Sequence, residues 1–445
     1  MKWRNLGIVA ALFLILGAYV YYYEIKGEKK REEASEKEKK LFQFEQKDVA
    51  SITIKTGNNE FALQKDKDTW KLTKPIETKA DKSTADSIAI DLASAKIDRN
   101  IDEQNIDWKK YGLDSPAVKL SAKLNDGKSY DIELGEKDFT DFSVFARIPG
   151  QNKVLVLPSS LLTSANKKLF ELRDKTVIEF QRDQIKEMSI EVKGKEYSFE
   201  KNGEDWMIKK PFQSRGDRSE IGSIVSDLEL AKVEEFVQSP ETNWKIYGLE
   251  KPGIRVNLLL GDNRARKTLL VGKKVDSVYY AKDESRASLF KIKEDLYKKL
   301  SLDPQKVRDK KVLRFERGDI HQIDIKLQDK TFAFSKGSDE KWKIVKPDGY
   351  KDKPIIEYKI FWPIEDLEGK ELIDNANLRD PQYGFSQPLA EIKLVDKNKK
   401  INEIVLGKLN KDKVYAKTND GMTIYKVDKK VLDDLNFKIE DLLEK

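Results

Sequence analysis

Three sequence blocks recur along this chain at a constant interval, and this internal repeat limits its possible folds more than any other feature. The block Trp70–Pro75 (WKLTKP) returns as Trp206–Pro211 (WMIKKP) and again as Trp342–Pro347 (WKIVKP). Both steps are 136 residues. A fixed period of this length indicates tandem copies of one module.

Two further landmarks keep the same period. A Tyr-Gly pair followed by a proline recurs at steps of 136 residues, and a Leu-Gly or Val-Gly pair follows each copy at nearly the same interval. The tyrosines and their glycines are Tyr111 and Gly112, Tyr247 and Gly248, and Tyr383 and Gly384. Three landmarks in register twice exclude a chance match and predict modules at residues 41–175, 176–310 and 311–445.

Each module contains more strand patterns than helix patterns. In the first copy, residues 50–55, 60–64 and 70–73 alternate as a strand meander, and residues 118–124, 129–134, 143–148 and 154–157 follow the Tyr-Gly pair. The turn sequence Asn125-Asp126-Gly127 favours antiparallel pairing. We therefore predict an α+β fold in which each module is a mainly antiparallel sheet with two helices.

The helices show one apolar face in each copy. Ile88, Leu92 and Ala95 recur at the same spacing in the second copy, whereas Pro363 in the third should end or kink its helix. A second helix should place Leu161 to Leu169 on one side. Asp81, Asp217 and, one residue out of register, Asp352 precede the first helix of each copy and are predicted N-caps.

The N-terminus carries an uninterrupted apolar run. Leu6–Tyr23 has 18 residues, which as a helix would span about 27 Å, close to the hydrocarbon core of a bilayer. No small-residue cleavage site ends the run, which favours an uncleaved signal anchor at residues 1–23 over a secretory signal peptide. Residues 24–40 mix Lys and Arg with Glu and are typical of a short charged helical stalk.

The charge pattern leaves the orientation of this anchor open. Lys2 and Arg4 precede the apolar run, but residues 24–40 contain seven Lys or Arg residues. The positive-inside rule would keep either flank in the cytoplasm.

The anchor and the repeated blocks together resemble the DUF4340 family, a domain of unknown function. The resemblance rests on W-x-[LI]-x-K-P and Y-G-[LF]-x-x-P, and it covers nearly all of residues 41–445 as three copies. It implies modules on the extracytoplasmic side of the cytoplasmic membrane, associated with ABC-type transport systems of the gliding-motility auxiliary type. It supplies no catalytic motif.

The repeated aromatic residues have two interpretations. Trp70, Trp206 and Trp342 could form a ligand platform, but large rings on the inward face of a meander strand are typical of a core. The three tyrosines and their glycines similarly favour a turn with positive φ. We therefore interpret these landmarks as structural.

The Lys-Pro corners are the one repeated feature that suggests binding. Lys74, Lys210 and Lys346 place a cation at the same position of each module. Three evenly spaced cations could contact an anionic polymer, although lysines at strand ends are commonly just solvated.

Composition excludes several classes of chemistry. The chain has no cysteine and a single histidine, His321, so disulfides, thiol catalysis, zinc-thiolate sites and sites with two imidazoles are excluded. The net charge of +7 on 445 residues, with acids and lysines interleaved, predicts no nucleic-acid binding. No nucleotide-binding, hydrolase-elbow or metalloprotease motif is present, so we expect no cofactor, no metal and no enzymatic activity.

Three functions remain in competition. The favoured one is a membrane-anchored extracytoplasmic scaffold or accessory protein that associates with an ABC-type transport complex. The alternative is an envelope polymer- or ligand-binding protein that uses the repeated module surfaces, and an enzyme acting on envelope material is third. The oligomeric state stays open.

At the junctions, Arg173-Asp174-Lys175 and Arg308-Asp309-Lys310 run directly into the next copy, so we expect joints there.

Overall fold

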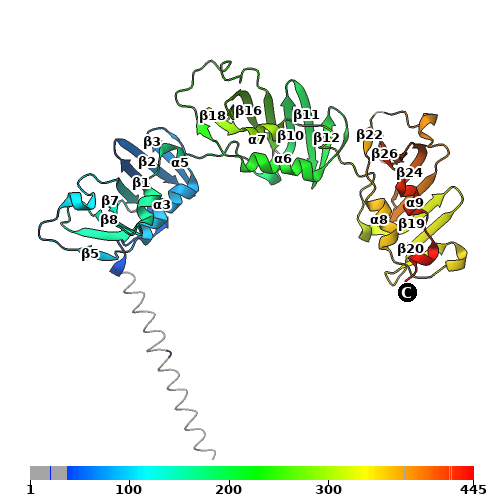
Figure 1. The fold of residues 1–445 in the computed structure, drawn as a ribbon, viewed down its shortest axis with the longest axis horizontal. Coiled ribbons are helices and arrows are strands. Elements are labelled where there is room, and N and C mark those ends of the chain that lie inside the picture. The colour runs from blue at the N-terminus through cyan, green and yellow to red at the C-terminus, as the bar shows by residue number, and fades with distance from the viewer. Residues whose placement is uncertain (1–20, 22–37, 375, 420, 422, 445) are drawn as a thin grey trace, which may run out of the picture. The chain divides into compact units, whose positions relative to one another are not determined.

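The computed structural model describes residues 21, 38–374, 376–419, 421 and 423–444. These residues form three antiparallel sheets, one in each predicted module (Figure 1). By its internal contacts the chain divides into two compact units, Met1–Lys175 and Thr176–Lys445. The first unit contains module 1 (residues 41–175), and the second contains module 2 (residues 176–310) and module 3 (residues 311–445).

Module 1 is a nine-stranded sheet with the order β4-β3-β2-β1-β6-β7-β8-β9-β5. Its strands are β1 (Val49–Thr56), β2 (Asn59–Asp66), β3 (Thr69–Lys74), β4 (Thr78–Lys79), β5 (Arg99–Ile101), β6 (Val118–Leu124), β7 (Ser129–Lys137), β8 (Ser143–Arg147) and β9 (Val154–Pro158). Its helices are α3 (Lys82–Ser94), α4 (Ser160–Ala165) and α5 (Leu169–Leu172). All seven strands predicted for this copy are present, and residues 118–124 match β6 at both ends.

Module 2 repeats this arrangement in the order β13-β12-β11-β10-β15-β16-β17-β18-β14. Its strands are β10 (Ile185–Val192), β11 (Lys195–Asn202), β12 (Asp205–Lys210), β13 (Ser214–Gly216), β14 (Glu235–Phe236), β15 (Ile254–Leu260), β16 (Ala265–Val275), β17 (Val278–Asp283) and β18 (Phe290–Lys293). Its helices are α6 (Arg218–Leu230) and α7 (Glu294–Leu300).

Module 3 has eight strands among its described residues, in the order β21-β20-β19-β23-β24-β25-β26-β22. They are β19 (Ile320–Leu327), β20 (Thr331–Lys336), β21 (Trp342–Lys346), β22 (Glu371–Ile373), β23 (Ala390–Asp396), β24 (Ile401–Asn410), β25 (Lys413–Thr418) and β26 (Ile424–Asp428). The helices are α8 (Tyr358–Glu365), α9 (Lys430–Leu435) and α10 (Ile439–Leu442).

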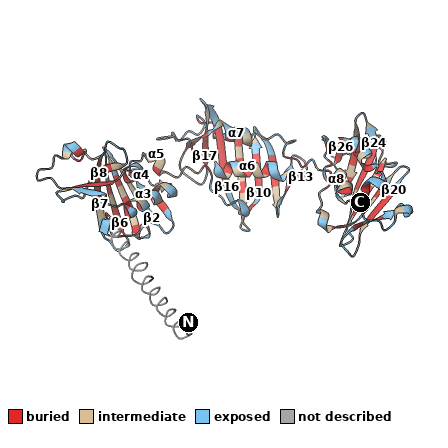
Figure 2. Cartoon of the chain, turned by 60° about the horizontal axis from the view of Figure 1, so that its bottom comes forward, coloured by how far each residue is buried: buried red, intermediate tan, exposed pale blue. Residues whose placement is uncertain are grey.

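The main core of each module lies between the sheet and its helices (Figure 2). Ile88 and Leu92 of α3 are fully buried against alternating strand residues, as the predicted helical face requires. A smaller cluster lies on the other face of the sheet. In module 1, Val144 and Ala146 of β8 belong to the main core, whereas Phe145 between them packs into the small cluster.

Two helix predictions need correction. The second helix of module 1 is not continuous from Leu161 to Leu169, because α4 ends at Ala165 and α5 begins at Leu169. Of the two outcomes predicted for Pro363, termination at that residue is wrong, because α8 continues to Glu365. The helix is short because it starts late: α3 and α6 span 13 residues, whereas α8 spans 8.

The N-cap predictions hold for two modules and fail for the third. The backbone N–H of Thr84 donates to the Asp81 carboxylate at 2.9 Å, and that of Glu220 donates to Asp217 at 2.9 Å. In module 3 the residue before α8 is Glu357, without a side-chain cap. Asp352 lies outside the helix with a positive φ of 64°, so it cannot cap α8.

The joint between modules 2 and 3 is built from buried charges within the second unit. Arg308 is fully buried, and its guanidinium donates to both carboxylate oxygens of Asp374, at 2.8 and 2.5 Å. The same guanidinium lies 4.4 Å from the centre of the Phe212 ring. Its neighbour Asp309, 2% exposed, accepts from Arg314 at 2.6 Å. The repeated Arg-Asp-Lys sequence therefore has a structural role at this junction.

The predicted anchor at residues 1–23 and most of the predicted stalk at residues 24–40 lie outside the described residues. Within the described part of the chain, no helix has both the length and the apolar composition that a membrane span requires.

Candidate functional site

The repeated tryptophans are core residues. Trp70 is 1% exposed, and Trp206 and Trp342 are similarly buried beneath the helices. The Trp70 indole N–H donates to Asp86 of α3 at 2.8 Å. Burial opposes ionisation of Asp86, but hydrogen bonds from Lys82 and Trp70 outweigh it and hold the pKa of this carboxyl below its usual value. None of the three rings is available as a ligand platform.

The Tyr-Gly pairs dock onto a bulge in the sheet. In module 2, the N–H of Lys273 donates to the carbonyl of Tyr247 at 2.9 Å, where the β16–β17 register shifts. Gly248 has a φ of 71°, which favours glycine. A Cβ on Gly272 would overlap the Tyr247 carbonyl oxygen. The same overlap occurs at Gly135 with Tyr111 and at Gly407 with Tyr383.

The tyrosines belong to the small clusters rather than to the main cores. Tyr111 packs edge-on against Phe145, and its hydroxyl donates to Glu103 at 2.8 Å, which lowers the pKa of that carboxyl. Tyr247 and Tyr383 occupy the corresponding clusters of modules 2 and 3. Because the tryptophans lie in the cores on the helix side of the sheets, the structure does not bring the two sets of landmarks together.

The Lys-Pro corners differ among the modules. Lys74 pairs with Glu60 at 2.9 Å, and Lys210 pairs with Glu196, at the equivalent position, at 2.7 Å. In module 3 the position of that carboxylate is occupied by Phe332. The three Lys-Pro peptide bonds are cis. Two of the three predicted anion contacts therefore already hold a carboxylate of their own module.

A groove lies between the helices of each module. In module 1 it measures about 550 Å³ and is lined largely by serine and threonine hydroxyls of α3 and α4. In module 2 it measures about 640 Å³ and lies between α6 and α7. In module 3 it measures about 880 Å³ and lies between α8 and the α9–α10 segment. The three grooves share a position but differ in chemistry.

The module 3 groove exposes aromatic side chains. Tyr358 and Trp362 lie one helical turn apart on α8, so they share a face, and they are 49% and 62% exposed. Ile360 and Ile364, which point the other way, are fully buried in the core. Leu367 and Phe437 add apolar surface to the groove lining. An exposed indole beside an apolar groove is a common feature of protein-binding surfaces.

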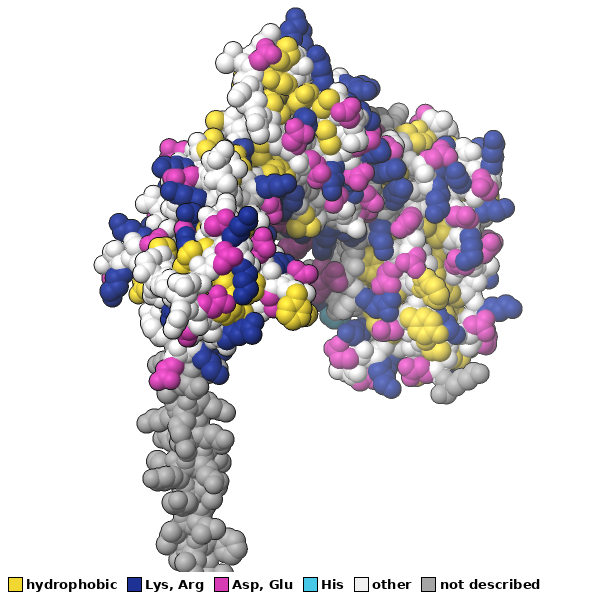
Figure 3. Space-filling view, turned by 60° about the vertical axis from the view of Figure 1, so that its left-hand side comes forward, with side chains coloured by type: hydrophobic (Ala, Val, Ile, Leu, Met, Phe, Trp, Pro, Cys, Tyr) yellow, Lys and Arg dark blue, Asp and Glu magenta, His cyan; other side chains and the backbone are white. Residues whose placement is uncertain are grey.

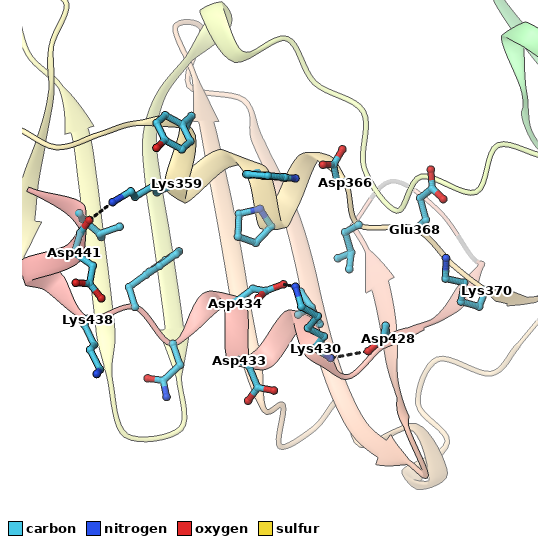
Figure 4. A pocket seen from close by; sticks show the side chains of 18 residues that line it. Lys359, Asp366, Glu368, Lys370, Asp428, Lys430, Asp433, Asp434, Lys438 and Asp441 are labelled. Carbon is cyan, nitrogen blue, oxygen red and sulfur yellow. Dashed lines mark hydrogen bonds and ion pairs between the residues drawn. The ribbon is translucent and has the colours of Figure 1, made fainter.

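Charged side chains surround the apolar part of this groove (Figure 4). Lys359 donates to the backbone carbonyl of Asp441, and Lys430 pairs with Asp434 at 3.0 Å. Six carboxylates and four lysines line it in total, namely Asp366, Glu368, Asp428, Asp433, Asp434 and Asp441 with Lys359, Lys370, Lys430 and Lys438. The rim is therefore more acidic than the chain as a whole, which carries +7.

On the face shown in Figure 3, acidic and basic side chains are interspersed. No group of His, Asp and Glu residues within the described chain is arranged to hold a metal ion. His321 lies on β19, with no counterpart in the other modules.

Sequence reasoning missed the module 3 groove. The signal was present at one position: in the helix register that aligns Ile88, Ile224 and Ile360, Trp362 is equivalent to Ile90 and Ser226. A tryptophan on the outward face of an amphipathic helix is unusual, because that face is normally polar. The repeat is defined by the residues that the three copies share, whereas the groove depends on a position at which one copy differs from the other two.

The sequence profile described as "Domain of unknown function (DUF4340)" matches the chain three times, over residues 70–243, 206–360 and 358–445. The first two matches begin at the repeated tryptophans Trp70 and Trp206 and continue into the following module. No curated protein matches the chain. Together the three matches run from Trp70 to the C-terminus, and the chain belongs to the DUF4340 family.

Proposed function

We propose that this protein is a membrane-anchored extracytoplasmic accessory protein that binds another protein of an ABC-type transport complex through the groove of module 3. The observation that carries the proposal is the pair of exposed aromatic side chains, Tyr358 and Trp362, in the largest of the three helix grooves. Trp and Tyr are the residues most enriched at the energetic centres of protein interfaces.

The anchor and the kind of complex come from sequence. The apolar run Leu6–Tyr23 has the length of a membrane span, and the family resemblance implies an extracytoplasmic location near a transporter. The repeated landmarks are scaffold residues, buried in cores and clusters, so they offer no common reaction centre. These points favour a binding role over an enzymatic one.

The chemistry of the groove indicates what the partner presents. An apolar floor with a carboxylate-rich rim fits a segment that has an apolar face flanked by lysine or arginine, such as an amphipathic helix. Binding of an anionic envelope polymer has less support, because Glu60 and Glu196 already pair with two of the three corner lysines.

The test is crosslinking in native membranes, followed by affinity purification of the full-length protein. The double variant Tyr358→Ala/Trp362→Ala removes both exposed rings, and Ile90→Ala is the matched control on the equivalent outward face of α3. We expect the wild type and the control to recover an ABC permease or its auxiliary subunit, and the double variant to lose it by about tenfold or more. Equal recovery by all three proteins would refute the role of the groove, and recovery of no transporter subunit would refute the proposed function.

A further inference from the structure

The segment formed by α8 and the residue after it carries two aromatic–acidic pairs at the same spacing. Phe361 and Glu365 form the first pair, and Trp362 and Asp366 form the second, each with the acid four residues after the ring. Residues four apart lie one turn apart on the same face of a helix. The N–H of Asp366 donates to the carbonyl of Trp362 at 3.1 Å, so the helical path reaches Asp366. In both pairs the acid therefore lies on the same face as its ring.

The first pair holds an arginine of its own module. The Arg317 guanidinium lies 5.1 Å from the centre of the Phe361 ring. It donates to both carboxylate oxygens of Glu365, from Nε at 3.0 Å and from Nη2 at 2.5 Å. A guanidinium fits such a pair because its flat face packs on the ring while its N–H groups reach the carboxylate.

The same arrangement recurs elsewhere in the described chain. In module 1 the Arg147 guanidinium lies 4.7 Å from the centre of the Trp108 ring, and its Nε donates to Glu133 at 2.5 Å. The buried Arg308 at the joint between modules 2 and 3 is also held by a ring and a carboxylate. This protein therefore binds guanidinium groups repeatedly with an aromatic ring and an acid.

The second pair on α8 holds no such group. Trp362 is mostly exposed, and within the described residues no basic side chain lies over its ring or pairs with the Asp366 carboxylate. Lys359, the one lysine of α8, donates instead to the backbone carbonyl of Asp441 (Figure 4). Both the ring and the acid are thus free to contact another molecule.

Only module 3 has this second pair. In the other two modules the ring is replaced by isoleucine or serine, and Asp366 is replaced by Ser94 in module 1 and by Leu230 in module 2. The two copies with the longer helix therefore lack both halves of the pair. The repeated scaffold does not require it, which leaves binding as its physical use.

We propose that Trp362 and Asp366 receive an arginine side chain of the partner protein, as the neighbouring pair receives Arg317. The guanidinium stacks on the exposed indole, and its N–H groups donate to the Asp366 carboxylate. The carboxylate-rich rim of the groove favours the approach of a basic segment. An ammonium group is more strongly hydrated than a guanidinium and lacks its flat face, so lysine fits less well. The inference rests on the proposed function and adds the residue type that the partner presents.

Fluorine NMR of the full-length chain, with 5-fluorotryptophan at its seven tryptophan positions, tests the inference. Trp362→Phe and Trp108→Phe assign the two resonances of interest. The probe is N-acetyl-arginine amide, and its control is N-acetyl-citrulline amide, which has nearly the same shape without the charge. We expect the arginine probe to shift the Trp362 resonance at least about threefold more than the citrulline probe does at equal concentration. The Trp108 resonance should not move, because Arg147 already lies over that ring.

Two aspartate variants separate a specific site from general attraction to the acidic rim. Asp366→Asn removes the proposed carboxylate and keeps the ring, so the shift caused by the arginine probe should fall at least about threefold. Asp433→Asn is the matched control, because this exposed carboxylate lines the same groove from α9, and it should change the shift less than about twofold. Equal effects of the two variants would overturn the inference. Equal shifts with arginine and citrulline, or with arginine and N-acetyl-lysine amide, would also overturn it.

The inference and the proposed function can fail separately. If the arginine probe does not shift the Trp362 resonance but crosslinking still recovers a transporter subunit through the groove, the partner docks by apolar contact and only the inference falls. If the probe binds as expected but no transporter subunit is recovered, the proposed function falls and the arginine site stands without it.

Discussion

At the scale of single residues, the repeated glycines have a common physical reason. Each Tyr-Gly pair lies against a second glycine in the sheet, and a side chain on either glycine meets backbone atoms that cannot move aside: a Cβ on Gly248 would lie 2.9 Å from the Lys273 nitrogen. Backbone overlap of this kind is relieved only by distorting the sheet bulge or the turn. The glycines recur every 136 residues because no side chain fits at these positions. This steric requirement explains the period at least as well as the burial of the repeated aromatic rings does.

Two glycines of module 2 should respond in opposite directions to alanine. Gly272→Ala should lower the free energy of unfolding by about 2–4 kcal/mol, because its Cβ overlaps the Tyr247 carbonyl. Gly222→Ala, in α6 with no atom within 4 Å of the new Cβ, should raise it by roughly 0.5–1 kcal/mol. Hydrogen exchange of module 2 peptides measures both. Equal effects of the two substitutions would contradict the account of the Tyr-Gly bulge.

Residue patterns in the sequence were informative where all copies agree. Three kinds of position could be predicted: the buried tryptophans, the glycines with positive φ, and the caps Asp81 and Asp217. Each depends on local geometry and recurs with the period of the modules. The exposure of Trp362 is indicated only by its outward position in the aligned helices, since a tryptophan in an apolar stretch, taken alone, ordinarily indicates a core.

At the scale of elements, the positions of most strands in the sequence were predictable, but which strands pair with one another was not. Alternating patterns located β1 to β3 and β6 to β9, since period-2 burial is encoded locally. The pairing of β1 with β6, which joins the two halves of the sheet across α3, depends on contacts distant in sequence. The short strand β5, whose three residues are partly or fully exposed, carries no such pattern.

A short edge strand of module 3 should depend on pH through one carboxylate. Glu371 of β22 accepts from Lys413 at 2.8 Å and from Lys426 at 2.6 Å, and these hydrogen bonds lower its pKa from 4.5 to about 2. Because the pKa is lower in the folded state, the stabilisation is complete above the unfolded value of about 4.5 and is lost as the pH falls toward 2.

The measurement is urea unfolding of the wild type and of Glu371→Gln at several pH values. We expect the wild type to have the higher midpoint at pH 6–7, and the difference to close between about pH 4.5 and 2. High salt should reduce the difference at neutral pH, because the three side chains are partly exposed. A gap that widens on acidification would contradict this assignment.

At the scale of the whole molecule, the joint between modules 2 and 3 contains an ion pair between the fully buried Arg308 and the partly exposed Asp374. Asp374→Ala should leave the Arg308 guanidinium buried without a counter-charge and should destabilise the joint by about 2–4 kcal/mol. Asp205→Ala, which removes an exposed partner of Arg218, is the control and should cost less than about 1 kcal/mol. Hydrogen exchange at residues 301–312 reports on the joint. Unchanged protection in Asp374→Ala would show that this pair does not hold the modules.

The organisation of the molecule into three copies of an α+β module was predictable from the period, and the family match supports the same repeats. Which copy carries an exposed aromatic groove was not predictable from the landmarks that the copies share, because the groove of module 3 is a difference between copies. It depends on a side chain that the scaffold does not require, namely Trp362.

The central claim is that the modules are held outside the cytoplasmic membrane, and labelling of one introduced cysteine tests it most directly. Lys411→Cys places a thiol in the exposed β24–β25 turn of a chain that has no other cysteine. Native cells stripped of their outer layers are treated with a maleimide that does not cross the cytoplasmic membrane. The account predicts full labelling before lysis and recovery of the labelled protein in the membrane fraction. Labelling only after lysis, or labelled protein free of the membrane, would contradict it.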